Sequence, residues 1–183
     1  MSRLTWAAGL ACVVLTCTGT ITTAAAQPIG GSRGPRAEVN GRTYVLLGPS
    51  VFGVTVQQDP LEYHATLFAD GSVHGTWRYD YWEAGQETTF SGQVTCLSVS
   101  GNRAWVGGPI TQSSDPTQVG QGAWWQVADN GSGRHPVTPD RTTFAGIGTM
   151  TQTTDYCADQ PDPHFIFDVQ LGGVSVRNLA STG

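Results

Sequence analysis

The chain carries, from His64 to Trp77, the stretch HATLFADGSVHGTW, in which two runs rich in β-formers flank an Asp-Gly pair. Asp70-Gly71 supplies the positive φ angles that a two-residue type I′ turn requires. That turn pairs His64 with Trp77 and Leu67 with His74, and so places the two histidines on opposite faces. A three-residue bulged loop would reverse this parity and bring them together. The segment therefore predicts a β-hairpin.

A second hairpin is predicted over residues 94–108, VTCLSVSGNRAWVGG, with its turn at Gly101-Asn102. This pairing puts Cys96 opposite Gly107, and a glycine leaves space above the strand. We expect a crossing loop that carries Cys157 to use this space for a disulfide with Cys96.

The rest of the chain shows the same β-rich pattern. From Glu38 onward no segment of helical length keeps an apolar i, i+3, i+4 pattern, whereas short β-rich runs separated by turn residues recur. Their spacing, roughly 10 to 15 residues, leaves no room for βαβ crossovers. We therefore expect residues 38–183 to form one all-β domain, an antiparallel meander of about eight strands closed as a barrel or a two-layer sandwich. The expected strands are 42–47, 61–69, 72–82, 88–99, 103–111, 122–128, 141–151 and 164–176, with a weaker one near 51–56.

Composition narrows the function classes. The chain has 183 residues, 24 of them Gly, and only 13% charged residues, against about 25% in an average protein. All 9 basic residues are Arg, so chemistry that depends on a catalytic or P-loop lysine is excluded. A net charge of −5 without an arginine cluster argues against nucleic-acid partners.

The N-terminal segment predicts export. Residues 1–26 have a positive start at Arg3, a mostly apolar middle and a small-residue cleavage site ending at Ala26, which together are typical of a signal peptide. Threonines interrupt the apolar run, so we expect no membrane span. Residues 27–37, QPIGGSRGPRA, are expected to be a flexible leader. Cleavage near Ala26 leaves two cysteines in an oxidising compartment, and we expect them to form one Cys96–Cys157 disulfide.

The second hairpin and a later turn resemble a known sequence pattern. Residues 94–108 read V-x-C-L-x-V-x-G-N-R-A-x-V-G-G, and residues 127–131 read V-x-D-N-G. This pattern is similar to that of a recurring family of uncharacterised secreted bacterial domains, glycine-rich and all-β, and it covers about residues 88 to 145. The resemblance implies a secreted all-β domain. The family has no agreed activity, so no catalytic residue is carried over.

Aromatic residues are the first candidates for a ligand site. Alternation along a strand sends Trp77, Tyr79 and Tyr81 to one face, and it sends the adjacent Trp124 and Trp125 to opposite faces. Exposed aromatic rings bind sugars or apolar ligands through flat apolar contact. These five residues are the predicted lining for a glycan or a small apolar ligand, and core filling is the alternative.

An acidic stretch is the candidate metal site. Asp155, Asp159 and Asp162 lie with His164 in a segment stiffened by two prolines. Carboxylates at this spacing could bind a structural calcium ion, and His164 could contribute to a transition-metal site. The alternative is a solvated loop held by the disulfide. Asn130-Gly131-Ser132 is a strong turn former and also a glycosylation sequon.

No motif in the chain predicts a particular reaction. There is no His-Glu-x-x-His, no Cys-x-x-Cys and no dinucleotide-binding glycine fingerprint. We therefore expect a non-enzymatic ligand-binding or surface-interaction module. Two alternatives are left open: a purely structural extracellular domain, and a small hydrolase or isomerase that uses His64, His74 or His164 with a carboxylate at a barrel mouth.

Overall fold

One antiparallel sheet forms the framework of the protein. The structure, a computed structural model, describes residues 34–48, 55–131 and 138–179, so the predicted signal peptide at 1–26 lies outside it. The described segments also contain the 3-10 helix η1 (Pro116–Gln118) and the α-helix α2 (Met150–Asp159). The strands are β1 (Pro35–Leu47), β2 (Val56–Phe68), β3 (Val73–Glu83), β4 (Gln86–Gln93), β5 (Cys96–Ser100), β6 (Arg103–Ser113), β7 (Gly122–Ala128), β8 (Arg141–Thr142), β9 (Gly146–Gly148), β10 (Phe167–Asp168) and β11 (Leu171–Asn178).

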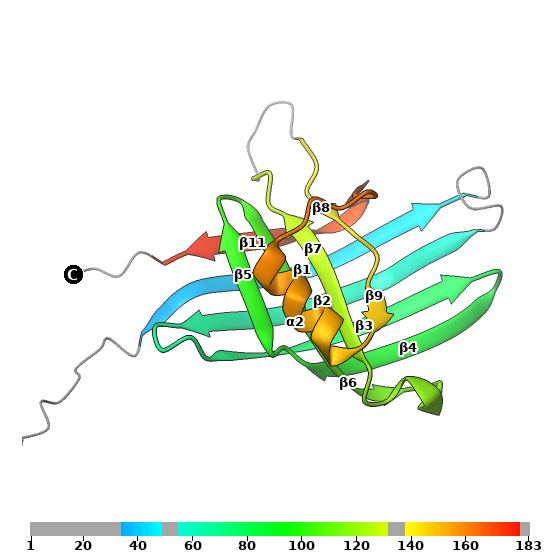
Figure 1. The fold of residues 1–183 in the computed structure, drawn as a ribbon. Helices are drawn as coiled ribbons and strands as arrows, with labels where there is room; N and C mark the ends of the chain where they lie inside the picture. The colour runs from blue at the N-terminus through cyan, green and yellow to red at the C-terminus, as the bar shows by residue number, and fades with distance from the viewer. Residues whose placement is uncertain (1–33, 49–54, 132–137, 180–183) are drawn as a thin grey trace, which may run out of the picture. The chain divides into compact units, whose positions relative to one another are not determined.

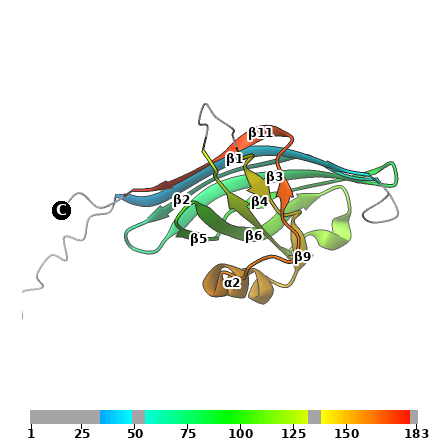
Figure 2. The same cartoon turned by 90° about the horizontal axis from the view of Figure 1, so that it is seen from above.

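The sheet curls into a half-barrel. Its strand order is β10-β8-β7-β6-β4-β3-β2-β1-β11, with β5 paired to β6 and β9 paired to β7. Sequential hairpins join β1 to β4, and β6 continues the sheet from β4 into its second half (Figure 1). Seen from above, β1–β4 and β11 form a curved layer that faces β5–β7 (Figure 2). The expected all-β antiparallel meander is confirmed.

The hydrophobic core fills the space between the two halves of the curled sheet. Trp125 of β7 is fully buried, and its ring lies 5.6 Å from the ring of Tyr63 in β2 and 5.6 Å from that of Trp77 in β3. Each aromatic pair of this kind stabilises a fold by about 0.5–1.5 kcal/mol beyond its area burial. The three rings therefore join the two halves at their centre.

The hairpin at residues 64–77 forms, but with a different register. Leu67 pairs with Val73 and His64 with Thr76, and Phe68 N donates to Ser72 O at 2.9 Å, so the loop consists of the three residues 69–71, with Gly71 at φ 83°. This is the three-residue bulged loop that was the alternative. Asp-Gly is compatible with both loop lengths, so the pair alone does not determine the register. The prediction that the two histidines lie on opposite faces is wrong: His64 and His74 share the convex face.

Several predicted element boundaries are corrected. The expected strand 88–99 is interrupted between β4 and β5, and β1 begins at Pro35, inside the expected leader. The expected strands 141–151 and 164–176 are represented by the short β8, β9 and β10 and by β11. Most of the weaker strand near 51–56 lies outside the described residues.

The predicted disulfide is confirmed, but helix α2 carries Cys157 where a loop was expected. Cys96 and Cys157 are bonded, with Cα atoms 6.1 Å apart. Gly107 is paired with Cys96 as predicted, and a Cβ there would lie 2.6 Å from Thr153 Cγ2 and 3.1 Å from Cys96 Sγ. Only glycine therefore lets α2 approach β6 this closely. No helix in the described segments is long and apolar enough to cross a membrane.

Candidate ligand-binding site

A cavity of about 620 Å³ opens beside the ends of β2, β3 and β4, and we call it the aromatic cavity. Its walls come from these three strands, from η1 and from the segment around β9. The lining residues are Val56, Tyr79, Tyr81, Glu83, Thr88, Phe90, Asp115, Gln118, Phe144, Ala145 and Ile147.

The floor of the aromatic cavity is made by β3 and β4. Tyr79, Tyr81 and Glu83 alternate along β3 and so point to the same face of the sheet. Tyr79 pairs with Phe90 of β4, and their rings stack with centroids 5.9 Å apart. The rings of Tyr79 and Tyr81 are 5.7 Å apart. The three rings form one continuous aromatic surface.

A wall stands nearly perpendicular to this floor. Phe144, between β8 and β9, meets Tyr81 edge-on, with ring centroids 6.1 Å apart and an interplanar angle of 83°. Phe167 of β10 also packs against Phe144, with ring centroids 5.3 Å apart. Aromatic rings therefore enclose the cavity from two directions.

The polar rim is built on η1. The carboxylate of Asp115 accepts hydrogen bonds from Thr117 N at 3.0 Å and from Thr117 Oγ1 at 2.7 Å, and these bonds lower the pKa of Asp115. Thr89 N donates to Ser114 Oγ at 3.0 Å, which ties this turn to β4. Gln118 Oε1 is buried and accepts no hydrogen bond from any residue that the structure describes.

The aromatic cavity is negatively charged. Glu83 and Asp115 are carboxylates, and none of the described lining residues is Lys, Arg or His. Burial first, and then the neighbouring Glu83, raise the pKa of Tyr81 to about 12. Tyr81 is therefore neutral at pH 7, and its hydroxyl donates to Glu83 Oε2 at 3.2 Å.

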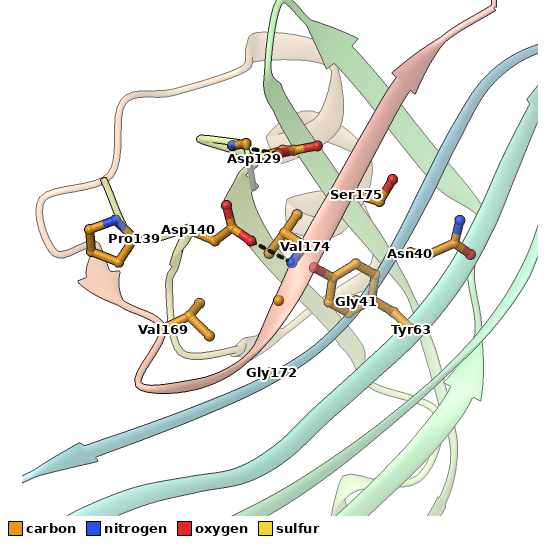
Figure 3. Close-up of a pocket in the computed structure, with 12 residues that line it drawn as sticks. Asn40, Gly41, Tyr63, Asp129, Pro139, Asp140, Val169, Gly172, Val174 and Ser175 are labelled. Atoms are coloured by element: carbon orange, nitrogen blue, oxygen red, sulfur yellow. Dashed lines mark hydrogen bonds between the residues drawn. The ribbon is translucent and has the colours of Figure 1, made fainter. Parts of the chain in front are cut away.

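A second cavity, the polar cavity, lies between β11 and the segment that joins β7 to β8 (Figure 3). Its volume is about 860 Å³. Its lining residues are Asn40, Gly41, Tyr63, Asp129, Gly131, Pro139, Asp140, Val169, Gly172, Gly173, Val174 and Ser175.

The carboxylates of the polar cavity are already occupied by the backbone. Asp140 accepts from Val174 N at 2.7 Å and from Asn130 N at 2.8 Å. Asp129 accepts from Val176 N at 3.0 Å and from Gly131 N at 2.9 Å. One oxygen of each carboxylate accepts from the edge of β11, and the other accepts from the β7–β8 segment itself, so each carboxylate links β11 to that segment. This cavity is larger than the aromatic cavity, but its carboxylates bond to the backbone and hold the fold together.

Tyr63 contributes a buried hydroxyl to the polar cavity. Its ring lies over Gly41, and Figure 3 shows its hydroxyl end directed toward β11. The hydroxyl has no hydrogen-bond partner among the described residues. Burial raises its pKa well above the ordinary value, and the charges of Asp140 and Asp129 raise the pKa further.

The five predicted ligand-binding aromatics are divided among three places. Tyr79 and Tyr81 line the aromatic cavity, although Tyr79 is only 2% exposed and belongs to the core, where Trp77 and Trp125 are also buried. Trp124 lies on the other face of β7, with its ring 6.2 Å from that of Tyr156 in α2. The predicted alternation of Trp124 and Trp125 is confirmed.

The four predicted metal ligands are not brought together. Asp155 and Asp159 lie on α2, where a loop was expected, because a capping box starts a helix at Thr149. Asp162 forms an ion pair with Arg103 at 2.6 Å. Among the described residues, which include His164, no three or more His, Cys, Asp or Glu side chains are grouped so that they could hold a metal ion.

Two of the histidines named for the enzymatic alternative, His64 and His74, line neither the aromatic cavity nor the polar cavity. His64 and His74 line a third cavity, of about 360 Å³, on the convex face, and no carboxylate is among its described lining residues. His64 Nδ1 makes its hydrogen bond with Asn40 Oδ1. Hydrogen bonds from Ser72 first, and then the charge of His74, lower the pKa of Asp70, so a carboxylate lies near His74 but is not among the described lining residues.

Sequence reasoning found part of the aromatic cavity. It missed Asp115, although Asp115-Pro116 is a helix-start signal of the N-cap and N1 type. It also missed Phe144, whose position depends on tertiary packing. Comparison of the chain with protein-family models, with curated proteins and with solved structures found no match.

Proposed function

We propose that the protein is a secreted, non-enzymatic module that binds a small, largely apolar ligand in the aromatic cavity. The observation that supports this most directly is the cavity of about 620 Å³ lined by Tyr79, Tyr81, Phe90 and Phe144. Small-molecule sites have volumes of roughly 300–1,000 Å³, mostly apolar walls and a few polar groups that orient the ligand. Glu83, Asp115 and Gln118 supply such groups.

The disulfide supports the secreted location. Cys96 and Cys157 are bonded across a sequence separation of 61 residues. Such bonds form and persist in oxidising compartments outside the cytosol. In the chain-entropy model a loop of this size is stabilised by about 4 kcal/mol. The disulfide that stabilises the fold requires an oxidising compartment, which agrees with the proposed secretion.

A catalytic role has less support. Acid–base chemistry at a histidine requires a carboxylate or substrate group within hydrogen-bond reach. The convex cavity holds His64 and His74 without a lining carboxylate, and the aromatic cavity holds carboxylates without a lining histidine. Binding is the function that these described cavities favour.

The proposal is tested with the neutral fluorescent probe N-phenyl-1-naphthylamine and the purified protein. We expect the probe to bind with enhanced fluorescence, and Tyr81→Ala to weaken binding roughly fivefold, because one aromatic contact is worth about 1 kcal/mol. The matched control is Trp82→Ala, the next residue on β3, which points to the opposite face. Absence of binding, or equal loss in both variants, would contradict the proposal.

A further inference from the structure

The charge and ring arrangement of the aromatic cavity indicate the class of ligand. Building on the proposed function, we infer that the cavity binds an organic cation of the quaternary ammonium type. The aromatic floor, the perpendicular Phe144 wall and the acidic rim each favour such a group.

The aromatic rings provide the first argument. The rings of Phe90, Tyr79, Tyr81 and Phe144 follow one another with neighbouring centroids 5.7 to 6.1 Å apart. The face of an aromatic ring carries partial negative charge and attracts a cation held within about 6 Å of its centroid. Tyr81 and Phe144 are partly exposed and offer ring surface that an organic cation can contact, whereas Tyr79 and Phe90 are buried and support Tyr81 from the core.

The formal charges provide the second argument. Glu83 and Asp115 give the lining two carboxylates, and none of the described lining residues is cationic. Gln118 Oε1 adds a buried partial negative charge that lacks a partner in the described chain. Such a site attracts cations and repels carboxylates and phosphates.

The angle between the rings distinguishes a cation from a sugar. A sugar stacks its flat face on a single ring. Here the Tyr81 and Phe144 rings meet at 83°, which makes a corner with two aromatic walls. A tetrahedral trimethylammonium group presents methyl groups in every direction and fits a corner of this kind.

The test compares choline with 3,3-dimethyl-1-butanol, in which carbon replaces the charged nitrogen. Both are titrated into the purified protein while the aromatic proton signals of the cavity are followed by NMR. We expect choline to bind at least tenfold more tightly than the neutral isostere, because only choline gains the interactions with the rings and carboxylates. Added salt should weaken choline binding and leave the isostere unaffected.

Charge-removing variants identify the carboxylates responsible. Glu83→Gln and Asp115→Asn should each weaken choline binding by about threefold and leave isostere binding unchanged. Asn is as good an N-cap as Asp, so Asp115→Asn retains η1. The matched control is Glu87→Gln, an exposed carboxylate on β4 outside the described lining, which should not change binding. Circular dichroism and thermal unfolding verify that each variant is folded.

The outcomes separate the two proposals. The cation inference is overturned, and the proposed function kept, if the isostere or neutral glycans bind as tightly as choline or more tightly. The same holds if choline does not bind while N-phenyl-1-naphthylamine does. Failure of all these probes overturns both. Equal loss of choline binding in Glu87→Gln and Glu83→Gln also overturns the inference, because it indicates a general charge effect.

Discussion

At the scale of single residues, Tyr63 combines a structural ring with an unsatisfied hydroxyl. Its ring packs on Trp125, whereas its buried hydroxyl finds no partner in the described segments. A buried polar group without a hydrogen bond opposes folding. We expect Tyr63→Phe, measured by urea unfolding at pH 7, to leave the free energy of unfolding unchanged or raise it by up to about 1 kcal/mol.

The same variant should change the response to alkaline pH. Burial, followed by Asp140 and Asp129, raises the pKa of Tyr63 in the folded protein. Above pH 10 the folded phenol keeps its proton while the unfolded one ionises, so unfolding releases a proton and stability falls as pH rises. Tyr63→Phe removes one such proton and should flatten the decline above pH 10 by at most about 1.4 kcal/mol per pH unit. Parallel declines in the two proteins would contradict this account.

At the scale of elements, the start of helix α2 depends on a capping box. Thr149 Oγ1 accepts from Gln152 N at 3.2 Å, and Gln152 Oε1 accepts from Thr149 N at 2.8 Å. We expect Thr149→Ala to lower the free energy of unfolding by about 1 kcal/mol and to speed hydrogen exchange in α2. The control is Thr154→Ala, in the exposed middle of the same helix, which should be neutral or slightly stabilising. Equal losses in both variants would mean that the cap has no special role.

The same elements show how far sequence patterns reach. Strand alternation correctly groups Tyr79 with Tyr81, since a period of two is a local property. Helix α2 is missed because it buries only Thr153 and Cys157, which gives no apolar stripe. The capping-box pattern of Thr149 and Gln152 is nevertheless present in the sequence and indicates a helix start. Phe144 joins the aromatic cavity through packing between distant segments, and no local pattern encodes that contact.

The hairpins show the same limit. The turn at Gly101-Asn102 has the predicted register, with Ser100 opposite Arg103. Asp70-Gly71 is compatible with loops of two and three residues, so the sequence pattern alone left the register open by one position. That one position decides which face carries His74.

At the scale of the whole molecule, carboxylates close the half-barrel where strand pairing ends. One edge of β11 pairs with β1, and its other edge donates Val174 N and Val176 N to Asp140 and Asp129. An open strand edge is a site of unwanted pairing, and side-chain acceptors cover it here. The polar cavity of Figure 3 therefore lies where side-chain hydrogen bonds, and not strand pairing, join β11 to the β7–β8 segment.

Removing one of these carboxylates should weaken the contact between β11 and the β7–β8 segment. Asp140→Ala deprives Val174 N and Asn130 N of their acceptor, and hydrogen bonds to charged groups contribute about 1.5–3 kcal/mol each. Because Val174 and Asn130 are only half-buried, water recovers part of this contribution, and we expect a loss of roughly 2–3 kcal/mol in the free energy of unfolding and faster hydrogen exchange at the Val174 amide. The control is Asp168→Ala, which removes an exposed ion pair with Arg141 and should cost less than about 1 kcal/mol. If the Val174 amide exchanged at the same rate in both variants, the carboxylates would not close the sheet, and the packing of Tyr63, Trp77 and Trp125 alone would hold its two halves together.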